Sequence, residues 1–166
     1  MAILGLFKRL LDAPLVFEDE RGRMEVLYES DGMVLKRSTS KKYVMRGLHH
    51  QAAPAKQNKI IRVISGSMID FVADPDDKAE VVWWSKINPD DQWIQIDSRF
   101  AHGFYATEDV VFEYFCEGGY SEGHEKTFLI TNLLERELGI KNLLLSDKDS
   151  NGKQFGNILK KFERCK

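Results

Sequence analysis

Three short phrases of the sequence hold the residue types that proton transfer requires. The first, residues 46–51, reads Arg-Gly-Leu-His-His-Gln and places His49 close to an arginine in an extended, apolar setting. The second, residues 100–104, holds a histidine between alanine and glycine, and the third, residues 146–149, ends in Asp149. Imidazole titrates near neutral pH, and a neighbouring carboxylate raises its pKa and fixes its orientation. We therefore predict that the three phrases meet in one active site for proton transfer.

The two adjacent histidines argue against a metal site. If residues 44–51 form a strand, His49 and His50 point to opposite faces, because neighbouring residues of a strand alternate. By the same alternation Gln51 shares the face of His49, and Arg46 lies on the other face. A metal-binding jelly roll needs histidines two residues apart and a later carboxylate, and this spacing is missing. We expect no metal ligands in this strand.

Three further side chains each allow a structural and a catalytic interpretation. In its apolar run, Tyr114 shares a face with Phe112 and Cys116, where it is either a core aromatic residue or an acid facing a cavity. Lys59 begins an apolar strand, where it is either solvated or, inside a barrel, an electrophile for a developing enolate. His102 has little bulk around it, which suits either close approach of a ligand or a satisfied core histidine. The sequence leaves these alternatives open.

Short β-rich runs, separated by close turns, fill the chain between residues 15 and 130. The strand-forming runs are 60–64, 68–73, 81–85, 93–96 and 110–116. The Ser-Gly-Ser turn at residues 65–67 predicts that the first two runs pair as a hairpin. Many short strands with close turns predict a β-sandwich or a barrel.

Helices are expected at both ends of this β-region. Apolar residues at helical spacing predict a helix over residues 2–11. Helical segments are also expected over about 132–163, beginning with a helix that Asn132 caps and Gly139 ends. The apolar residues that predict a terminal amphipathic helix are Phe155, Ile158, Leu159 and Phe162.

Length and composition are those of an ordinary globular domain. The chain has 166 residues, of which 30% are charged and 43% hydrophobic, and we expect residues 1–166 to form one domain. Its formal net charge of -2 gives no bulk attraction to nucleic acid. No run approaches the roughly 18 apolar residues of a membrane span, the charge order of a signal peptide is missing, and Cys116 and Cys165 lack a metal spacing. We expect a cytoplasmic protein without nucleic-acid or membrane partners.

The order and spacing of the motifs resemble the dTDP-4-dehydrorhamnose 3,5-epimerases, a family of cupin-type jelly rolls that act without metal or cofactor. The resemblance runs from Phe17 to about Asp149, and Lys59 follows ten residues after His49. The matching phrases are residues 17–22, 38–40, 44–49, 100–104, 112–114 and 146–149. Together they are specific, although each is short. The resemblance implies an all-β, cupin-type jelly-roll β-sandwich or barrel, a nucleotide-sugar substrate, no cofactor, and a homodimer built by strand exchange in which each pocket borrows residues from the partner.

The resemblance also implies roles for individual residues. His49 would be the base, paired with Asp149, and Tyr114 the acid on the opposite side of the sugar ring. Lys59 would support the oxyanion. The residues implied for substrate binding are Arg21, Arg46, Gln51, His102, Tyr120, Glu125 and Lys148. The implied reaction inverts C3, C5 or both of a nucleotide-linked 4-keto-6-deoxy sugar, in a pathway to surface polysaccharide or a glycosylated product.

The chain also departs from the family. Val34 and Lys36 stand where the family usually has a glutamine and an asparagine that contact the ligand. Asp97 and Arg99 replace a proline and a glycine, and the loop after Asp74 is short. These changes leave the nucleotide and the sugar open. Three other functions fit parts of the sequence: a nucleotide-sugar ketoisomerase, a non-catalytic sugar-binding cupin and a metal-dependent cupin oxygenase.

Overall fold

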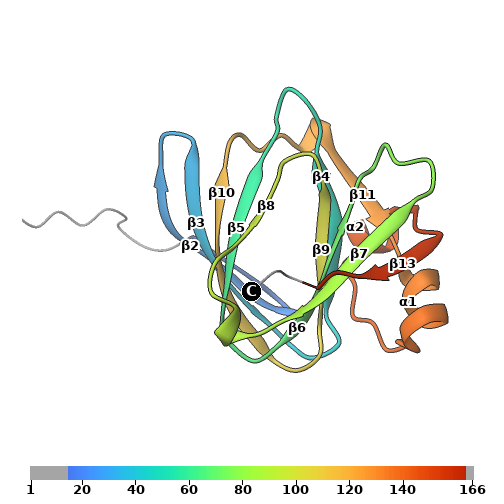
Figure 1. The fold of residues 1–166 in the computed structure, drawn as a ribbon. Helices are drawn as coiled ribbons and strands as arrows, with labels where there is room; N and C mark the ends of the chain where they lie inside the picture. Colours follow the sequence, from blue (N-terminus) through green and yellow to red (C-terminus); the bar gives the residue numbers. More distant parts are fainter. Residues whose placement is uncertain (1–14, 164–166) are drawn as a thin grey trace, which may run out of the picture.

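Two curved β-sheets face each other and form the body of the molecule (Figure 1). The computed structural model describes residues 15–163, so the helix expected over residues 2–11 lies outside the described residues. The six-stranded sheet has the order β1 (Leu15–Asp19), β2 (Gly22–Ser30), β3 (Met33–Ser40), β10 (Val110–Glu117), β5 (Asn58–Ser65), β8 (Ile94–Ile96). The seven-stranded sheet has the order β12 (Lys153–Gln154), β11 (Glu125–Leu129), β4 (Met45–Gln51), β9 (Ala101–Ala106), β6 (Met68–Ala73), β7 (Val81–Ile87), β13 (Ile158–Lys161).

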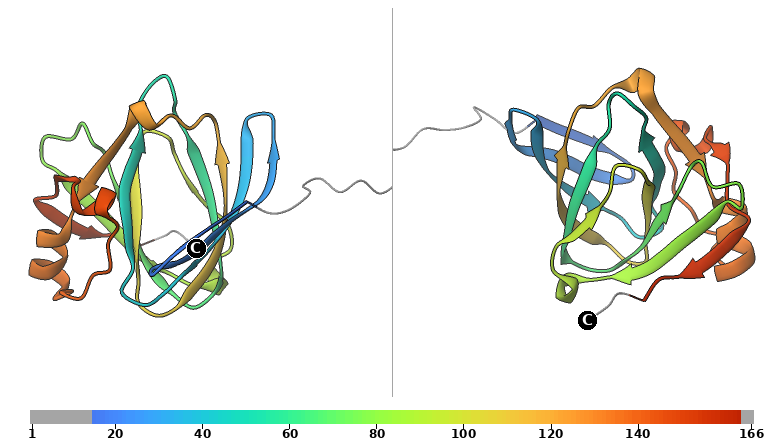
Figure 2. Two further views of the ribbon diagram at one scale, coloured as in Figure 1. Left: turned by 180° about the vertical axis from the view of Figure 1, so that it is seen from behind. Right: turned by 45° about the horizontal axis from the view of Figure 1, so that its top comes forward.

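The helices are short and lie outside the space between the sheets (Figures 1 and 2). They are α1 (Thr131–Leu138) and α2 (Asp147–Ser150), with two 3-10 turns, η1 (Pro89–Asp91) and η2 (Glu122–His124). Within residues 15–163, no helix is long and apolar enough to cross a membrane. The prediction of an all-β, two-sheet fold with peripheral helical segments is confirmed for this part of the chain.

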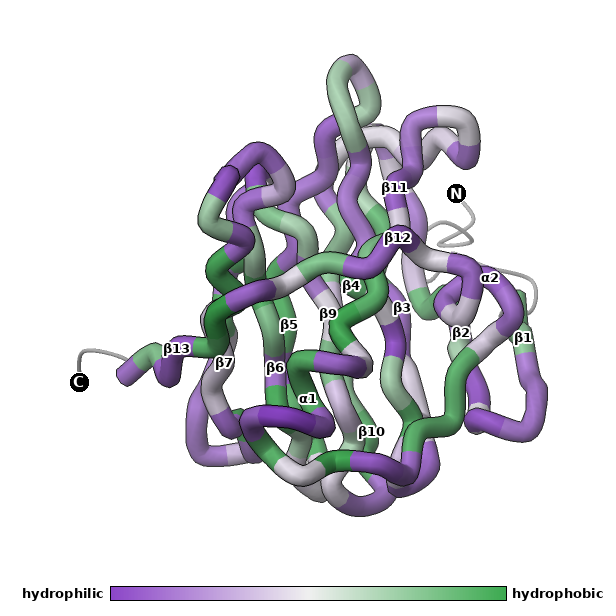
Figure 3. Tube along the Cα trace, turned by 90° about the vertical axis from the view of Figure 1, so that its right-hand side faces the viewer, coloured by the Kyte–Doolittle hydropathy of each residue, from purple (hydrophilic) through white to green (hydrophobic). Residues whose placement is uncertain are grey.

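Strand alternation gives the molecule two hydrophobic cores. The inner core lies between the sheets and includes Ile61 of β5, Phe112 of β10 and Phe104 of β9. The outer core lies between the seven-stranded sheet and α1, where Phe71 of β6 and Leu134 of α1 are fully buried. Figure 3 views the molecule from the α1 side and shows hydrophobic segments in the strands behind the helix. Burial of such a side chain stabilises the folded protein by about 1.5–3 kcal/mol. The outer core therefore adds stability, and part of the inner face can carry polar groups instead of apolar ones.

Two local predictions are wrong. The strands on either side of residues 65–67 do not form a hairpin: β5 pairs with β10 and β8, and β6 pairs with β7 and β9. The turn therefore carries the chain from one sheet to the other, and Gly66 adopts a φ of 77° there. The terminal amphipathic helix is also absent from residues 15–163, because β12 pairs with β11 and β13 pairs with β7.

The helix predicted near residue 132 is present as α1, but its start differs from the prediction. Ile130 occupies the N-cap position and no side chain caps the helix, so Asn132 lies inside it. Gly139 ends the helix in the left-handed conformation, as predicted. Packing of Leu133 and Leu134 against the sheet, rather than a cap, holds this helix in place.

Candidate active site

Two cavities, of about 640 and 130 Å³, lie between the sheets and share part of their lining. The residues that line both are Lys36, His49, Lys59, His102, Tyr114, Tyr120 and Glu125. Arg46 and Lys148 line the larger cavity only, and Gln51 the smaller one only. Asp149 and Arg21 line neither cavity but contact the site from behind. The structure therefore gathers in one place residues that are distant in the sequence.

A local irregularity at Gly47 turns both Arg46 and His49 into the larger cavity. Arg46 lies opposite Phe104 of β9 and His49 opposite His102, so the register shifts between them. Gly47 has a φ of 95°, and a Cβ there would lie 2.6 Å from the His102 carbonyl oxygen. The prediction that Arg46 and His49 point to opposite faces is therefore wrong.

Beyond the irregularity the expected alternation returns. His49 and Gln51 both reach the smaller cavity, whereas His50 lines neither cavity. The Nδ1 atom of His50 is buried without a hydrogen-bond partner among the described residues. The prediction that His50 is aimed away from His49 is confirmed.

His49 and Asp149 form a hydrogen-bonded pair. The distance between Nε2 of His49 and Oδ1 of Asp149 is 2.6 Å, and Asp149 is only 1% exposed. Ser146 caps α2 by accepting from the Asp149 backbone N–H, and its hydroxyl donates to Oδ2 of Asp149 at 2.8 Å. An ionised Asp149 accepts the Nε2 hydrogen of His49 and leaves Nδ1 as the free acceptor of the ring. The short sequence phrase at residues 146–149 thus holds the carboxylate that pairs with His49.

The ionisation of this pair suits a proton acceptor. Burial lowers the pKa of His49, and the hydrogen bond and charge of Asp149 offset only part of that effect. Burial alone would raise the pKa of Asp149, but the bonds from His49 and Ser146 bring it below its usual value. His49 is therefore neutral and Asp149 ionised near neutral pH. The sequence predicted a raised pKa for His49, and burial reverses that direction.

Tyr114 lies on the opposite wall from His49. It belongs to β10 of the six-stranded sheet, whereas His49 belongs to β4 of the seven-stranded sheet. Burial, and to a lesser extent Cys116, raise the pKa of the Tyr114 phenol, so the hydroxyl keeps its proton. Of the two interpretations of Tyr114, the cavity-facing one holds, because the side chain lines both cavities.

Lys59 also faces the interior rather than the solvent. It lies on β5 directly opposite Cys116 of β10 and lines both cavities. Burial lowers the pKa of its ammonium group, although the nearby Cys116 and Glu125 act in the other direction. A half-buried cation that faces the cavities and has no salt bridge within residues 15–163 is available to an anionic group of a ligand.

His102 combines both interpretations that its sequence allowed. Its Nε2 lies 2.6 Å from Oδ1 of Asp70, and the two residues are 7% and 8% exposed. The ring is thus satisfied by a partner, yet it lines both cavities. Sequence reasoning missed Asp70, which is the one charged residue of the apolar strand β6. A carboxylate at an inward-facing position of such a strand was the available signal.

A polar cluster around Glu125 contributes to the lining of the cavities. Lys148 donates to Oε2 of Glu125 at 2.7 Å, and the Tyr120 hydroxyl donates to the same oxygen at 3.2 Å. The side-chain oxygen of Gln51 accepts from the Ser121 backbone N–H, while its amide nitrogen is buried and has no partner within the described residues. That nitrogen is a free donor next to the smaller cavity.

Two arginines approach the site from different sides. Nε of Arg46 donates to the Ser40 hydroxyl at 3.3 Å, and burial, followed by the charge of Arg21, lowers the pKa of Arg46. Arg21 pairs with Asp19 and lies 3.6 Å from Oδ2 of Asp149. Arg21 therefore touches the carboxylate that supports His49 rather than the cavity itself.

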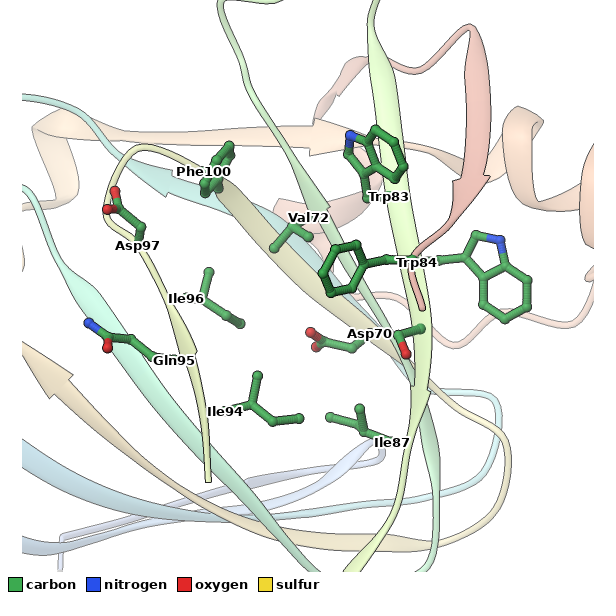
Figure 4. Close-up of a pocket in the computed structure, with 12 residues that line it drawn as sticks. Asp70, Val72, Trp83, Trp84, Ile87, Ile94, Gln95, Ile96, Asp97 and Phe100 are labelled. Atoms are coloured by element: carbon green, nitrogen blue, oxygen red, sulfur yellow. The ribbon is translucent and has the colours of Figure 1, made fainter. Parts of the chain in front are cut away.

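In the part of the chain that the structure describes, no metal cluster is present, and a third cavity has a different lining. No three His, Cys, Asp or Glu side chains gather there as a metal site would require. The third cavity, of about 510 Å³, lies beside β6, β7 and β8 and is lined by apolar side chains such as Val72, Trp83 and Ile94 (Figure 4). Its ionisable side chains are the carboxylates Asp70 and Asp97, and its lining contains no histidine, lysine or arginine.

Comparisons with known proteins identify the relatives of this chain. The sequence profile of a family described as dTDP-4-dehydrorhamnose 3,5-epimerase matches residues 8–157. An enzyme of that name from Shigella flexneri is 32% identical over 163 residues, which cover 88% of this chain and 90% of the relative. The crystal structure of dTDP-4-dehydrorhamnose 3,5-epimerase from Sulfolobus tokodaii is 30% identical, with a TM-score of 0.62 over 84% of this chain and 85% of that chain.

A more distant structure shares the fold. ChmJ, a 3′-monoepimerase from Streptomyces bikiniensis crystallised with dTDP-quinovose, is 22% identical, with a TM-score of 0.61 over 85% of this chain and 80% of that chain. The facing sheets, the polar interior and these relatives define an enzyme of the isomerase class, a cupin-type epimerase. The chain belongs to the dTDP-4-dehydrorhamnose 3,5-epimerase family.

Proposed function

We propose that this chain inverts C3, C5 or both of a dTDP-linked 4-keto-6-deoxy hexose by proton transfer between its own side chains, without a cofactor. The observation that carries the proposal is the placement of a neutral His49, paired with Asp149, and a protonated Tyr114 on opposite walls of one site. Inversion requires removal of a proton from one face of a carbon and delivery to the other. Groups on opposite walls meet that requirement.

In the first step His49 takes the proton next to the ketone. The electron pair of the broken C–H bond forms a double bond to the carbonyl carbon. The carbonyl electron pair moves to the oxygen, which becomes negative. Lys59 stabilises that oxygen, since a preorganised cation in a water-poor site lowers the barrier to its formation. Asp149 holds the imidazole in place and stabilises the imidazolium that forms. A positioned base of this kind contributes about 10²–10⁴-fold in rate.

In the second step Tyr114 delivers its proton to the other face of the same carbon. Before the next inversion the His49 imidazolium releases its proton to water and the Tyr114 phenolate takes one up. Arg46 is the cation whose charge acts on the Tyr114 oxygen. Repetition at the second carbon next to the ketone requires no additional group, because both carbons are activated by the same carbonyl.

The remaining polar residues would bind the substrate. Arg46 and Lys148 line the larger cavity and suit the diphosphate, because Arg and Lys are the usual partners of phosphate oxygens. The apolar side chains that line that cavity, including Phe17 and Met24, suit the nucleoside. Gln51 with its free amide nitrogen, and His102, Tyr120 and Glu125, suit the hydroxyl groups of the sugar. Arg21 would act through Asp149.

We also propose that the enzyme is a cytoplasmic homodimer on a route to a cell-surface or glycosylated product. The support for a dimer is β1, the outer strand of its sheet, where Leu15 and Phe17 are 57% and 52% exposed. Exposed edge strands with apolar side chains pair readily with another chain. Both residues also line the larger cavity, so a partner seated on β1 would complete the site.

The test is incubation of the protein with dTDP-4-keto-6-deoxyglucose in deuterated water. We expect deuterium at C3, at C5 or at both, together with the inverted sugar, detected by nuclear magnetic resonance. Movement of the carbonyl to a neighbouring carbon would instead identify a ketoisomerase. Absence of both exchange and product from a protein that binds the nucleotide sugar would identify a non-catalytic binding protein.

A further inference from the structure

Lys36 enters the active site from the strand next to Tyr114. β3, β10 and β5 are neighbours in the six-stranded sheet. Lys36 of β3 lies directly opposite Tyr114 of β10, and Lys59 of β5 lies directly opposite Cys116 of β10. Lys36 and Lys59 both line the larger and the smaller cavity. Two lysines on either side of β10 therefore point into the same part of the site.

The charges of these two lysines are not neutralised by the described residues. No salt bridge joins Lys36 or Lys59 to a carboxylate within residues 15–163. The carboxylates whose charge acts on Lys59 are engaged elsewhere: Glu125 accepts from Lys148 and Tyr120, and Asp70 pairs with His102. Burial is the largest cause of the lowered pKa of Lys59, and the positive charge of Lys36 lowers it further. Unneutralised cations in a buried site attract an anion strongly.

The position of Lys36 favours an interaction with the sugar over an interaction with the diphosphate. Arg46 and Lys148, which suit the diphosphate, line the larger cavity only, whereas Lys36 reaches the smaller cavity together with Lys59. The base His49 and the acid Tyr114 line that same shared region. Lys36 therefore lies in the same region of the site as His49, Tyr114 and Lys59, where the proposed proton transfer would take place.

We propose that Lys36 is a second cation that, together with Lys59, stabilises the negative oxygen formed when His49 removes a proton from the keto sugar. The inference rests on the proposed epimerase function and adds a residue to its machinery. The C–H bond breaks, its proton moves to His49, and its electron pair forms the carbon–carbon double bond while the carbonyl pair moves to oxygen. The full negative charge exists only after proton removal, so two ammonium groups act more strongly on the enolate than on the ketone.

The experiment compares Lys36→Met and Lys36→Arg with wild type and with Lys153→Met, which removes an exposed lysine of β12 outside both cavities. Two quantities are measured: the turnover number for deuterium exchange into saturating dTDP-4-keto-6-deoxyglucose, and the Kd for dTDP, which carries the diphosphate but no ketone. We expect Lys36→Met to lower the turnover number about 10–10²-fold, because removal of one oxyanion-stabilising donor costs at most about 10²–10³-fold and Lys59 remains. The Kd for dTDP should stay within about twofold, Lys36→Arg should recover most of the exchange, and Lys153→Met should match wild type.

The pH profile gives an independent readout. The charged and titratable groups around Lys59 are Cys116, Glu125, Asp70 and Lys36, and Lys36 lowers the Lys59 pKa. Loss of its charge should move the alkaline limit of activity, where Lys59 loses its proton, to higher pH. A Lys36 whose charge does not act on Lys59 would not produce this shift.

Several results overturn the inference. One is a turnover number for Lys36→Met equal to that of wild type, and another is a raised Kd for dTDP with unchanged turnover, which would assign Lys36 to the diphosphate. Retained dTDP binding and an unchanged Tm show that a loss of exchange is not a loss of fold, and failure of Lys36→Arg to recover exchange also contradicts a role through charge. Wild-type protein that exchanges no hydrogen would reject the proposed function itself, whereas active wild type with a fully active Lys36→Met rejects Lys36 alone.

Discussion

At the scale of single residues, one physical cause acts on both the proposed base and the proposed acid. Burial disfavours the charged form of any titratable group. For His49 the neutral form is the proton acceptor, and for Tyr114 the neutral form is the proton donor. Burial lowers the pKa of His49 and raises the pKa of Tyr114, so each group is in its neutral form near neutral pH. The residue types were visible in the sequence, but the direction of the His49 shift depended on burial that only the fold provides.

Asp149→Asn tests the support of the base. Activity requires neutral His49, so the rate falls as the pH drops through the His49 pKa, which lies below its usual 6.5. Asp149 raises that pKa, so its loss should move the acid limit of activity to still lower pH. The rate should fall about 10²–10⁴-fold, because the ring loses its orientation and its charge partner. Kinetics of exchange over a pH range of about 4–8 measure both effects.

The matched control is Asp147→Asn, an exposed carboxylate of the same helix α2, which should leave rate and pH profile unchanged. An Asp149→Asn protein with the wild-type rate and the wild-type acid limit would show that Asp149 does not support the base.

At the scale of elements, strand content was predictable and strand pairing was not. Composition and turns predicted β5 and β6 as strands, but a hairpin was inferred because the nearest partner in sequence is the simplest one. In the structure β5 pairs with β10, a strand far along the chain, which no local pattern records. The segment at β12 and β13 has helical spacing of its apolar residues, but contacts with β11 and β7 override that preference.

For the site too, features set by the local sequence were predictable and features set by a distant strand were not. The order of the motifs along the sequence was enough to group His49, Tyr114, Lys59 and Asp149. The irregularity at Gly47 was not predicted, because strict alternation is the default for a strand and only the approach of β9 requires the break. For these reasons the residues of the site were more predictable than the faces on which they lie.

Gly47→Ala tests whether this irregularity positions the base. A Cβ at Gly47 would lie 2.6 Å from the His102 carbonyl oxygen, and the φ of 95° is itself unfavourable for alanine. We expect a loss of about 1–3 kcal/mol of stability, seen as a lower Tm, and a larger loss of exchange activity than the Tm change explains. The reason is that Arg46 and His49 depend on the shifted register.

The control for this substitution is Gly123→Ala, because nothing lies within 4 Å of the position of its Cβ and no positive φ constrains it. If Gly47→Ala matched Gly123→Ala in both Tm and exchange, the register shift would have no role in catalysis.

At the scale of the whole molecule, the two sheets supply different residues of the site. The seven-stranded sheet supplies His49 and His102, the six-stranded sheet supplies Tyr114 and Lys59, and the outer core with α1 stabilises the first sheet from behind. The proposed acid and base therefore lie on two different walls of the site. The exposed β1 lies at the edge of the six-stranded sheet, where an additional chain can extend the wall.

Phe17→Ser tests the proposed dimer. Removal of this 52% exposed aromatic residue from β1 should shift the protein from dimer to monomer in sedimentation experiments and raise the KM, because Phe17 also lines the larger cavity. Ile64→Ser, at a 44% exposed apolar residue of β5 outside both cavities, is the control and should remain dimeric. Monomeric wild type, or dimeric Phe17→Ser with unchanged KM, would contradict the proposal.

The proposed mechanism requires that a sugar carbon loses a proton toward one wall of the site and gains one from the other wall. Tyr114→Phe tests this requirement. The measurement is the ratio of deuterium incorporation to inverted product, in deuterated water, for wild type, Tyr114→Phe and the control Tyr105→Phe, whose ring packs in the outer core. We predict that Tyr114→Phe still exchanges hydrogen through His49 but forms little inverted product, so that the ratio rises, while Tyr105→Phe keeps the wild-type ratio. An unchanged ratio for Tyr114→Phe would contradict this mechanism and return Tyr114 to a role in packing alone.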